Sequence, residues 1–181
     1  MATQIRNITI VGMGMIGASF AAAFRAQHPD SRVLGVDVSQ ESLDTALSRG
    51  WITDAALPED PAFAAFVQST CDLVMLAVPV DFAEGYFKRL DEWGFRGIIT
   101  DTASTKGRIC AVAERTLQNP ALYLPGHPMA GSEKNGIEGA RAQMFHGAHW
   151  ILCPDERTHT QAYTAMHDLL ADIGARVISL P

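Results

Sequence analysis

Cysteine is scarce in this sequence, and positive charge is outweighed by negative charge. The 181 residues include only three cysteines, Cys71, Cys110 and Cys153, which are widely spaced and form no Cys-x-x-Cys pair. Such a set excludes a disulfide framework and predicts reduced thiols, as in a cytoplasmic protein. Lys and Arg number 14 against 20 Asp and Glu, so the net charge is −6, and no basic block occurs. This balance argues against a nucleic-acid partner or an acidic membrane surface and leaves small molecules as the expected ligands.

Long hydrophobic runs are absent as well. Residues 8–24 are uncharged and follow Arg6, like the core of a signal peptide, but three glycines in Gly-x-Gly-x-x-Gly spacing argue against that interpretation. No other stretch approaches the length of a membrane span. The six histidines show no metal-ligand spacing, so no metal is expected. A composition of 48% hydrophobic and 19% charged residues predicts one globular domain over residues 1–181.

The most informative stretch joins a short apolar run to a glycine turn. Residues 8–11 read as a β-strand, and Gly12, Gly14 and Gly17 follow at the start of an alanine-rich helix. This order is typical of a dinucleotide-binding unit. The first glycine makes the turn, the second lets a pyrophosphate approach the backbone, and the third lets the helix pack closely on the strand. The free amides at the start of the helix would face the phosphates.

Asp37 strengthens this interpretation. It ends a second strand-like run, residues 32–36, and lies about 20 residues after Gly17, where a carboxylate can accept both ribose hydroxyls and repel a 2′-phosphate. No arginine follows closely, the nearest downstream being Arg49, so NAD is favoured over NADP. The alternative is that Asp37 is a solvated residue before Ser39, the expected N-cap of the next helix.

Strand-like runs alternate with helical patterns along the rest of the chain. The later strands are expected at 72–78, 97–102, 122–125, 150–153 and 176–180. The later helices are expected at 39–50, 62–67, 82–93, 106–117 and 160–173, with a loop at 54–61. Phe82 is expected to face the core. This alternation predicts an α/β fold with a doubly wound, mostly parallel sheet of the Rossmann type.

Two loops that follow predicted strands carry reactive side chains. Asp101, Ser104 and Lys106 follow the strand at 97–102, and His127 and Glu133 follow the strand at 122–125. Ligands of doubly wound sheets bind beyond the carboxyl ends of the strands, so both loops should lie near the nicotinamide. Oxidation of an alcohol requires a proton acceptor, and histidine is well matched to that task near neutral pH. The alternatives are that Asp101 and Ser104 cap the helix at 106 and that His127 is structural.

These motifs together resemble the prephenate/arogenate dehydrogenases of tyrosine biosynthesis. The resemblance rests on the glycine turn, on D-T-A-S-T-K at 101–106 and above all on G-H-P-M-A-G-S-E at 126–133. It covers essentially all 181 residues and ends where the nucleotide domain of that family gives way to a helical dimerisation domain. It implies NAD-dependent oxidative decarboxylation of prephenate to 4-hydroxyphenylpyruvate, or of arogenate to tyrosine, by a homodimer whose helical domain is absent from this chain.

The resemblance also implies roles for particular residues. His127 would hydrogen-bond the ring 4-hydroxyl and take its proton, Ser104 would bind near that hydroxyl, and Glu133 would lie at the mouth of the site. The residues expected to bind substrate are Ser104, Lys106, His127, Ser132 and Glu133, with the role of Lys106 left open. The residues expected to bind the cofactor are Gly12, Gly14, Met15, Ile16, Gly17, Asp37, Val78, Pro79, Asp101 and Thr102.

Part of the substrate site is expected to lie outside this chain. The arginine that clamps a substrate carboxylate in this family belongs to the helical domain, so the chain is expected to bind NAD but to turn substrate over poorly. One alternative is a β-hydroxyacid or imine-reductase type dehydrogenase, whose catalytic lysine would normally lie outside this chain. Another is a module that senses NAD without transferring hydride.

Overall fold

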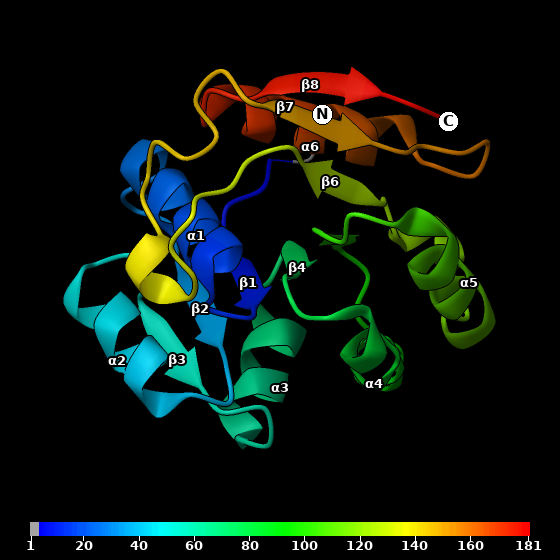
Figure 1. Ribbon diagram of the computed structural model, residues 1–181. Coiled ribbons are helices and arrows are strands. Elements are labelled where there is room, and N and C mark those ends of the chain that lie inside the picture. Colours follow the sequence, from blue (N-terminus) through cyan, green and yellow to red (C-terminus); the bar gives the residue numbers. More distant parts are fainter. Residues whose placement is uncertain (1–3) are drawn as a thin grey trace.

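The computed structural model describes residues 4–181 and contains two β-sheets covered by helices (Figure 1). The central sheet is parallel, with its strands in the order β3-β2-β1-β4-β5. Its strands are β1 (Ile8–Val11), β2 (Val33–Val36), β3 (Asp54–Ala56), β4 (Leu73–Leu76) and β5 (Ile98–Asp101). The chain reverses its direction of travel across the sheet between β3 and β4, so the carboxyl ends of β1 and β4 flank a crevice suited to a ligand.

Helices cover both faces of the central sheet. Leu73 and Met75 of β4 belong to one apolar cluster, and Val74 and Leu76 belong to the other. A strand buried on both faces therefore reads as a continuous apolar run. Helices α1 (Met15–Gln27) and α2 (Gln40–Ser48) contribute to the first cluster, and α3 (Pro61–Ser69), α4 (Val80–Glu92) and α5 (Lys106–Thr116) contribute to the second.

The last three strands form a separate sheet against α1. This sheet comprises β6 (Gly126–Pro128), β7 (His149–Leu152) and β8 (Arg176–Ser179), with β6 antiparallel to β7 and β7 parallel to β8. Figure 1 shows it along one side of the molecule together with α6 (Thr160–Asp172). Trp150 is fully buried, and its ring lies 5.6 Å from that of Phe20 in α1. The second sheet is thereby fixed to the first helix of the nucleotide-binding unit.

The strand predicted at 122–125 is displaced toward the carboxyl end of the chain. Residues Pro120–Leu122 form a 3₁₀ turn, and Tyr123 makes an isolated parallel bridge to Ile99 of β5. Pro125 has no N–H to donate, so pairing with β5 stops there and the chain joins β7 instead. His127 consequently lies within β6 and not in a loop after a strand.

Two further expectations are corrected. Residues 54–61 were predicted as a loop, but Asp54–Ala56 pairs with β2, beside an ion pair in which Arg32 lies 2.8 Å from Asp54. Long-range pairing here overrides the poor strand propensity of Asp and Ala. Helix α4 begins at Val80, before the predicted residue 82, and Phe82 is 61% exposed instead of facing the core. No helix in the described part of the chain, residues 4–181, combines the length and apolar character needed to cross a membrane.

Candidate active site

The glycine turn after β1 has the geometry that its spacing predicts. Gly12 has a φ of +101°, and a Cβ there would lie 2.3 Å from the carbonyl oxygen of Ala77. A Cβ on Gly17 would lie 1.8 Å from the carbonyl oxygen of Gly12. Gly14 differs, because within the described residues a Cβ there would meet no atom within 4 Å. The first and third glycines are therefore required by packing, and the second faces open space.

That open space is a cavity of about 380 Å³ at the carboxyl ends of β1, β4 and β5. Of the predicted site residues, those that line it are Gly14, Met15, Ile16, Gly17, Val78, Pro79, Thr102 and Ser104. In the described structure α1 has no side-chain cap, and the amide of Ala18 is the first to bond back into the helix, to the carbonyl of Gly14. The three preceding amides thus lack intrahelical partners and suit a pyrophosphate.

Asp37 follows β2 and is bound to the glycine turn. Its carboxylate accepts the amide of Met13 at 2.6 Å through Oδ2 and the amide of Ser39 at 2.8 Å through Oδ1. Ser39 caps α2 through the amide of Ser42, as predicted. A carboxylate oxygen has about two lone-pair sites, so Asp37 retains capacity for ribose hydroxyls. The contact to Met13 was not predicted, because sequence spacing does not show backbone amides that point across strands.

Asp101 is fully buried at the end of β5 and accepts four hydrogen bonds. Oδ2 accepts the amide of Ala103 at 2.9 Å and Nζ of Lys106 at 2.5 Å. Oδ1 accepts the hydroxyl of Tyr123 at 2.8 Å and the amide of Gly126 at 3.1 Å. Its side chain is therefore committed to the protein interior, whereas the adjoining Thr102 lines the cavity. A direct contact between Asp101 and the cofactor stays a prediction.

Tyr123 is a residue of the site that sequence reasoning missed. Burial, together with the neighbouring Asp101 carboxylate, holds the pKa of Tyr123 well above its usual value, so the hydroxyl remains a donor. The available signal was a tyrosine in an otherwise apolar run, because a buried tyrosine hydroxyl usually has a hydrogen-bond partner.

His127 lies in β6, directly after Gly126, whose amide donates to Asp101. It is half-buried, and among residues 4–181 its buried Nδ1 has no hydrogen-bond partner. A buried imidazole nitrogen without a partner is costly, which favours a water or ligand atom beside it. The loop that follows reaches the cavity, because a Cβ on Gly131 would lie 3.8 Å from Cε of Met15. The structure thus brings the histidine segment to the glycine turn.

The remaining predicted residues lie on the same side but are more exposed. Ser104 is exposed and lines the cavity, and the N-cap of α5 is Thr105, so Ser104 does not cap that helix. Ser132 bonds the backbone of Lys134, accepting its amide at 3.0 Å. Glu133 is exposed in the same loop. These positions suit a surface that substrate approaches from solvent.

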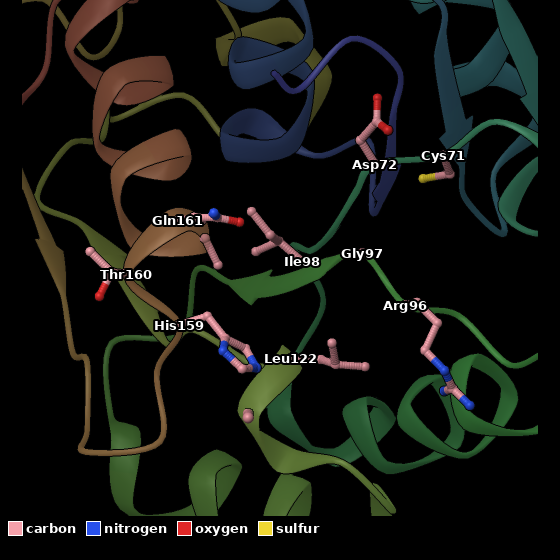
Figure 2. Close-up of a pocket in the computed structure, with 11 residues that line it drawn as sticks. Cys71, Asp72, Arg96, Gly97, Ile98, Leu122, His159, Thr160 and Gln161 are labelled. Atoms are coloured by element: carbon pink, nitrogen blue, oxygen red, sulfur yellow. The ribbon is translucent and has the colours of Figure 1, made fainter. Parts of the chain in front are cut away.

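A larger cavity, of about 710 Å³, lies elsewhere, at the amino ends of β4 and β5 (Figure 2). Its labelled lining residues are Cys71, Asp72, Arg96, Gly97, Ile98, Leu122, His159, Thr160 and Gln161. Burial raises the pKa of the Cys71 thiol to about 12, so this thiol stays protonated. No predicted site residue is among the described residues that line this cavity.

The strand order, the glycine turn after β1 and the acid after β2 define a Rossmann-type dinucleotide-binding domain. Comparison with known families narrows this class. The family model described as "Prephenate dehydrogenase, nucleotide-binding domain" matches residues 20–179. The chain belongs to this family, which confirms the predicted resemblance and the predicted fold.

Relatives of known name agree with this assignment. The prephenate dehydrogenase of Bacillus subtilis is 34% identical over 179 residues, which are 96% of this chain and 46% of that protein. The Aquifex aeolicus prephenate dehydrogenase, solved with hydroxyphenyl propionate and NAD⁺, has 28% identity and a TM-score of 0.85, covering 99% of this chain and 61% of that one. Synechocystis arogenate dehydrogenase has 27% identity and a TM-score of 0.83, covering 96% of this chain and 59% of that one. The chain thus spans about half the length of the curated relatives it matches.

Proposed function

We propose that this chain is the NAD-binding domain of a dehydrogenase that converts prephenate to 4-hydroxyphenylpyruvate and carbon dioxide. The observation that carries the proposal is the junction at Asp101, where the loop lining the nucleotide cavity and the strand bearing His127 are bound to one carboxylate. A proton acceptor beside a nucleotide cavity is what the oxidation of an alcohol requires.

The cofactor proposal rests on three features of the chain. Gly14 leaves open space where a pyrophosphate would lie, the first amides of α1 face the cavity, and Asp37 is fixed where it can accept ribose hydroxyls. When bound, NAD supplies the hydride acceptor. The solved Aquifex aeolicus relative contains NAD⁺, which supports the same cofactor here.

His127 would act on the ring 4-hydroxyl of the substrate. Neutral imidazole accepts the hydroxyl proton while C4 loses hydride, and a ring ketone forms. That ketone is conjugated to C1, so the electrons of the C1–carboxylate bond move into the ring as carbon dioxide leaves, and the ring becomes aromatic. The ring oxygen then takes back the proton that His127 accepted, which gives the phenol of the product. Ser104 would orient the hydroxyl, with Ser132 and Glu133 near the substrate. The protein therefore supplies alignment and proton acceptance.

Arogenate is the second candidate substrate. It differs from prephenate only at the side-chain carbon, which bears an amino group instead of a keto group, and Synechocystis arogenate dehydrogenase matches this chain at 27% identity. The names of the curated relatives favour prephenate.

We further propose that the complete enzyme is a homodimer. We also propose that it is cytoplasmic, in keeping with the three unpaired cysteines of the described chain.

The test is NADH formation with prephenate and with arogenate, using this chain beside the longest protein that its gene encodes. We expect the longer protein to oxidise prephenate and to release one carbon dioxide for each NADH formed. Activity with arogenate alone would mean that arogenate, and not prephenate, is the substrate. Inactivity on both substrates with NAD still bound would favour the β-hydroxyacid type of dehydrogenase or the NAD-sensing module.

A further inference from the structure

We propose that the buried Asp101–Lys106 pair is a positioning device that holds the cavity loop with Ser104 and the strand with His127 in one fixed relation. The catalytic consequence rests on the proposed function, whereas the geometry does not depend on it. In this proposal Lys106 acts on the reaction through the residues that it binds and does not contact the substrate.

The first step of the argument is that Asp101 has no free acceptor. Four donors from four residues occupy both oxygens of a carboxylate that is 0% exposed. The amide of Ala103 belongs to the loop that carries Ser104, and the amide of Gly126 belongs to the strand that carries His127. A shift of either segment would break a bond to a buried charge, which is costly.

Lys106 completes the attachment of the histidine strand. Its Nζ donates to Oδ2 of Asp101 and also to the carbonyl of Gly126, and its side chain is 19% exposed. Gly126 is therefore held on both sides, its N–H by Asp101 and its carbonyl by Lys106. The approach is close, because a Cβ on Gly126 would lie 3.0 Å from the carbonyl oxygen of Asp101 and 3.0 Å from Nε1 of Trp150.

The second step is that the two segments belong to different sheets. Ser104 follows β5 of the central sheet, whereas His127 lies in β6 of the other sheet. The backbone joins them at Ile99, which bridges to Tyr123 and accepts the amide of Leu124 at 2.8 Å, before His127 is reached. The Asp101–Lys106 pair binds the two segments closer to Ser104 and His127 and so contributes to the distance between the proton acceptor and the cavity loop. Reaction rates are sensitive to such placement, since a displacement of about 1 Å can cost about 100-fold.

The kinetic test uses the longest protein that the gene encodes, with K106M, K106R and K88M. Lys88 is an exposed lysine of α4 that pairs with Glu84 at 2.9 Å, so K88M is a matched control. We expect K106M to lower kcat by about 100-fold while the KM for NAD and for prephenate changes less than about threefold. We expect K106R, which keeps the charge and the donors, to recover kcat to within about tenfold of wild type, and K88M to match wild type.

Three results would overturn the proposal. An increase in the KM for prephenate at unchanged kcat would mean that Lys106 binds substrate directly. Equal losses of NAD affinity and kcat would mean that the pair only supports the fold. Wild-type kcat in K106M would mean that the pair has no part in placement.

A second measurement does not depend on the substrate. In backbone amide NMR spectra of the 181-residue chain, K106M should shift the signals of 102–105 and 126–127 together and leave those of the glycine turn unchanged. Shifts confined to 105–108 would contradict the proposal. If K106M does not fold, Y123F removes one bond to Asp101 and should shift the same two segments. An enzyme inactive on both substrates would refute the proposed function, and these spectra would still decide the positioning role.

Discussion

At the scale of single residues, Asp37 has a task that its position in the sequence does not show. Its carboxylate binds the amides of Met13 and Ser39, so it ties the glycine turn to the end of β2 before any ribose is present. The same charge lies where the 2′-phosphate of NADP would be repelled. Structure and cofactor choice therefore depend on one side chain.

An Asp37→Asn substitution separates these tasks. Asn replaces one carboxylate oxygen by a nitrogen that donates and cannot accept, so only one of the bonds from Met13 and Ser39 can remain. We therefore expect a loss of about 1–3 kcal/mol in the free energy of unfolding. We also expect NAD affinity to fall by about tenfold or more, a loss of about 1.4 kcal/mol, and discrimination against NADP to weaken. Calorimetry with NAD and with NADP measures the two affinities, and denaturant unfolding measures the free energy of unfolding. D44N, on the exposed surface of α2, is the control and should match wild type.

His127 gives the prediction that decides between dehydrogenase classes. In the complete enzyme, His127→Asn should lower kcat by about 100- to 10,000-fold, the usual contribution of a general base, because Asn cannot take the proton. NAD affinity should stay unchanged. His167→Asn, on the exposed surface of α6, serves as the matched control. Near-normal rates in H127N would favour the β-hydroxyacid type, whose base would lie elsewhere.

At the scale of elements, the glycine turn contains two kinds of glycine. Gly12 and Gly17 are fixed by contacts with backbone atoms, whereas Gly14 faces open space in the described structure. A methyl group at Gly14 should therefore leave the fold intact and obstruct only a ligand.

Gly14→Ala should weaken NAD binding by about tenfold or more, while the free energy of unfolding falls by only about 0.5–1 kcal/mol, because Gly14 is the N-cap of α1 and glycine is favoured over alanine there. Gly85→Ala is the comparison, because Gly85 lies on α4 where an added Cβ also meets no described atom within 4 Å. In that helix interior alanine should stabilise by about 0.5–1 kcal/mol and leave NAD binding alone. Calorimetry and denaturant unfolding measure both effects. Wild-type NAD affinity in G14A would mean that the pyrophosphate lies elsewhere.

The elements also show what the sequence could and could not predict. Local sequence patterns were sufficient to predict the first strand, the glycine turn and the apolar run of β4. Strand β3 and the displacement of the strand at 122–125 depend on partners distant in sequence, such as β2 and β7. The site followed the same division. His127 and Ser104 were proposed from motifs. The hydrogen bonds that Tyr123 and Gly126 donate to Asp101 form only when residues 123–126 pack against β5, so the sequence did not predict them.

At the scale of the whole molecule, the cavity lies at the edge of the central sheet, whereas His127 lies in the second sheet. Met129, two residues after His127, is 56% exposed. The chain also covers only 46% of its Bacillus subtilis relative. The expectation that part of the substrate site lies outside this chain can be tested by turnover.

The 181-residue chain should therefore bind NAD with an affinity close to that of the longest protein its gene encodes. Its kcat on prephenate should be lower by at least about 100-fold, because substrate alignment would be incomplete. Calorimetry and NADH absorbance on both proteins provide the comparison. Equal turnover by the two would show that the chain contains the whole substrate site.

The saturated carboxylate of Asp101 has a consequence for how this protein can change over generations. A mutation that removes Lys106 first leaves a buried anion beside Tyr123, and a mutation that removes Asp101 first leaves a half-buried ammonium group. Either single step passes through an impaired intermediate, so the two positions should be inherited as a pair. Descendants that lack one partner should also lack the other and should carry a different attachment between the two sheets.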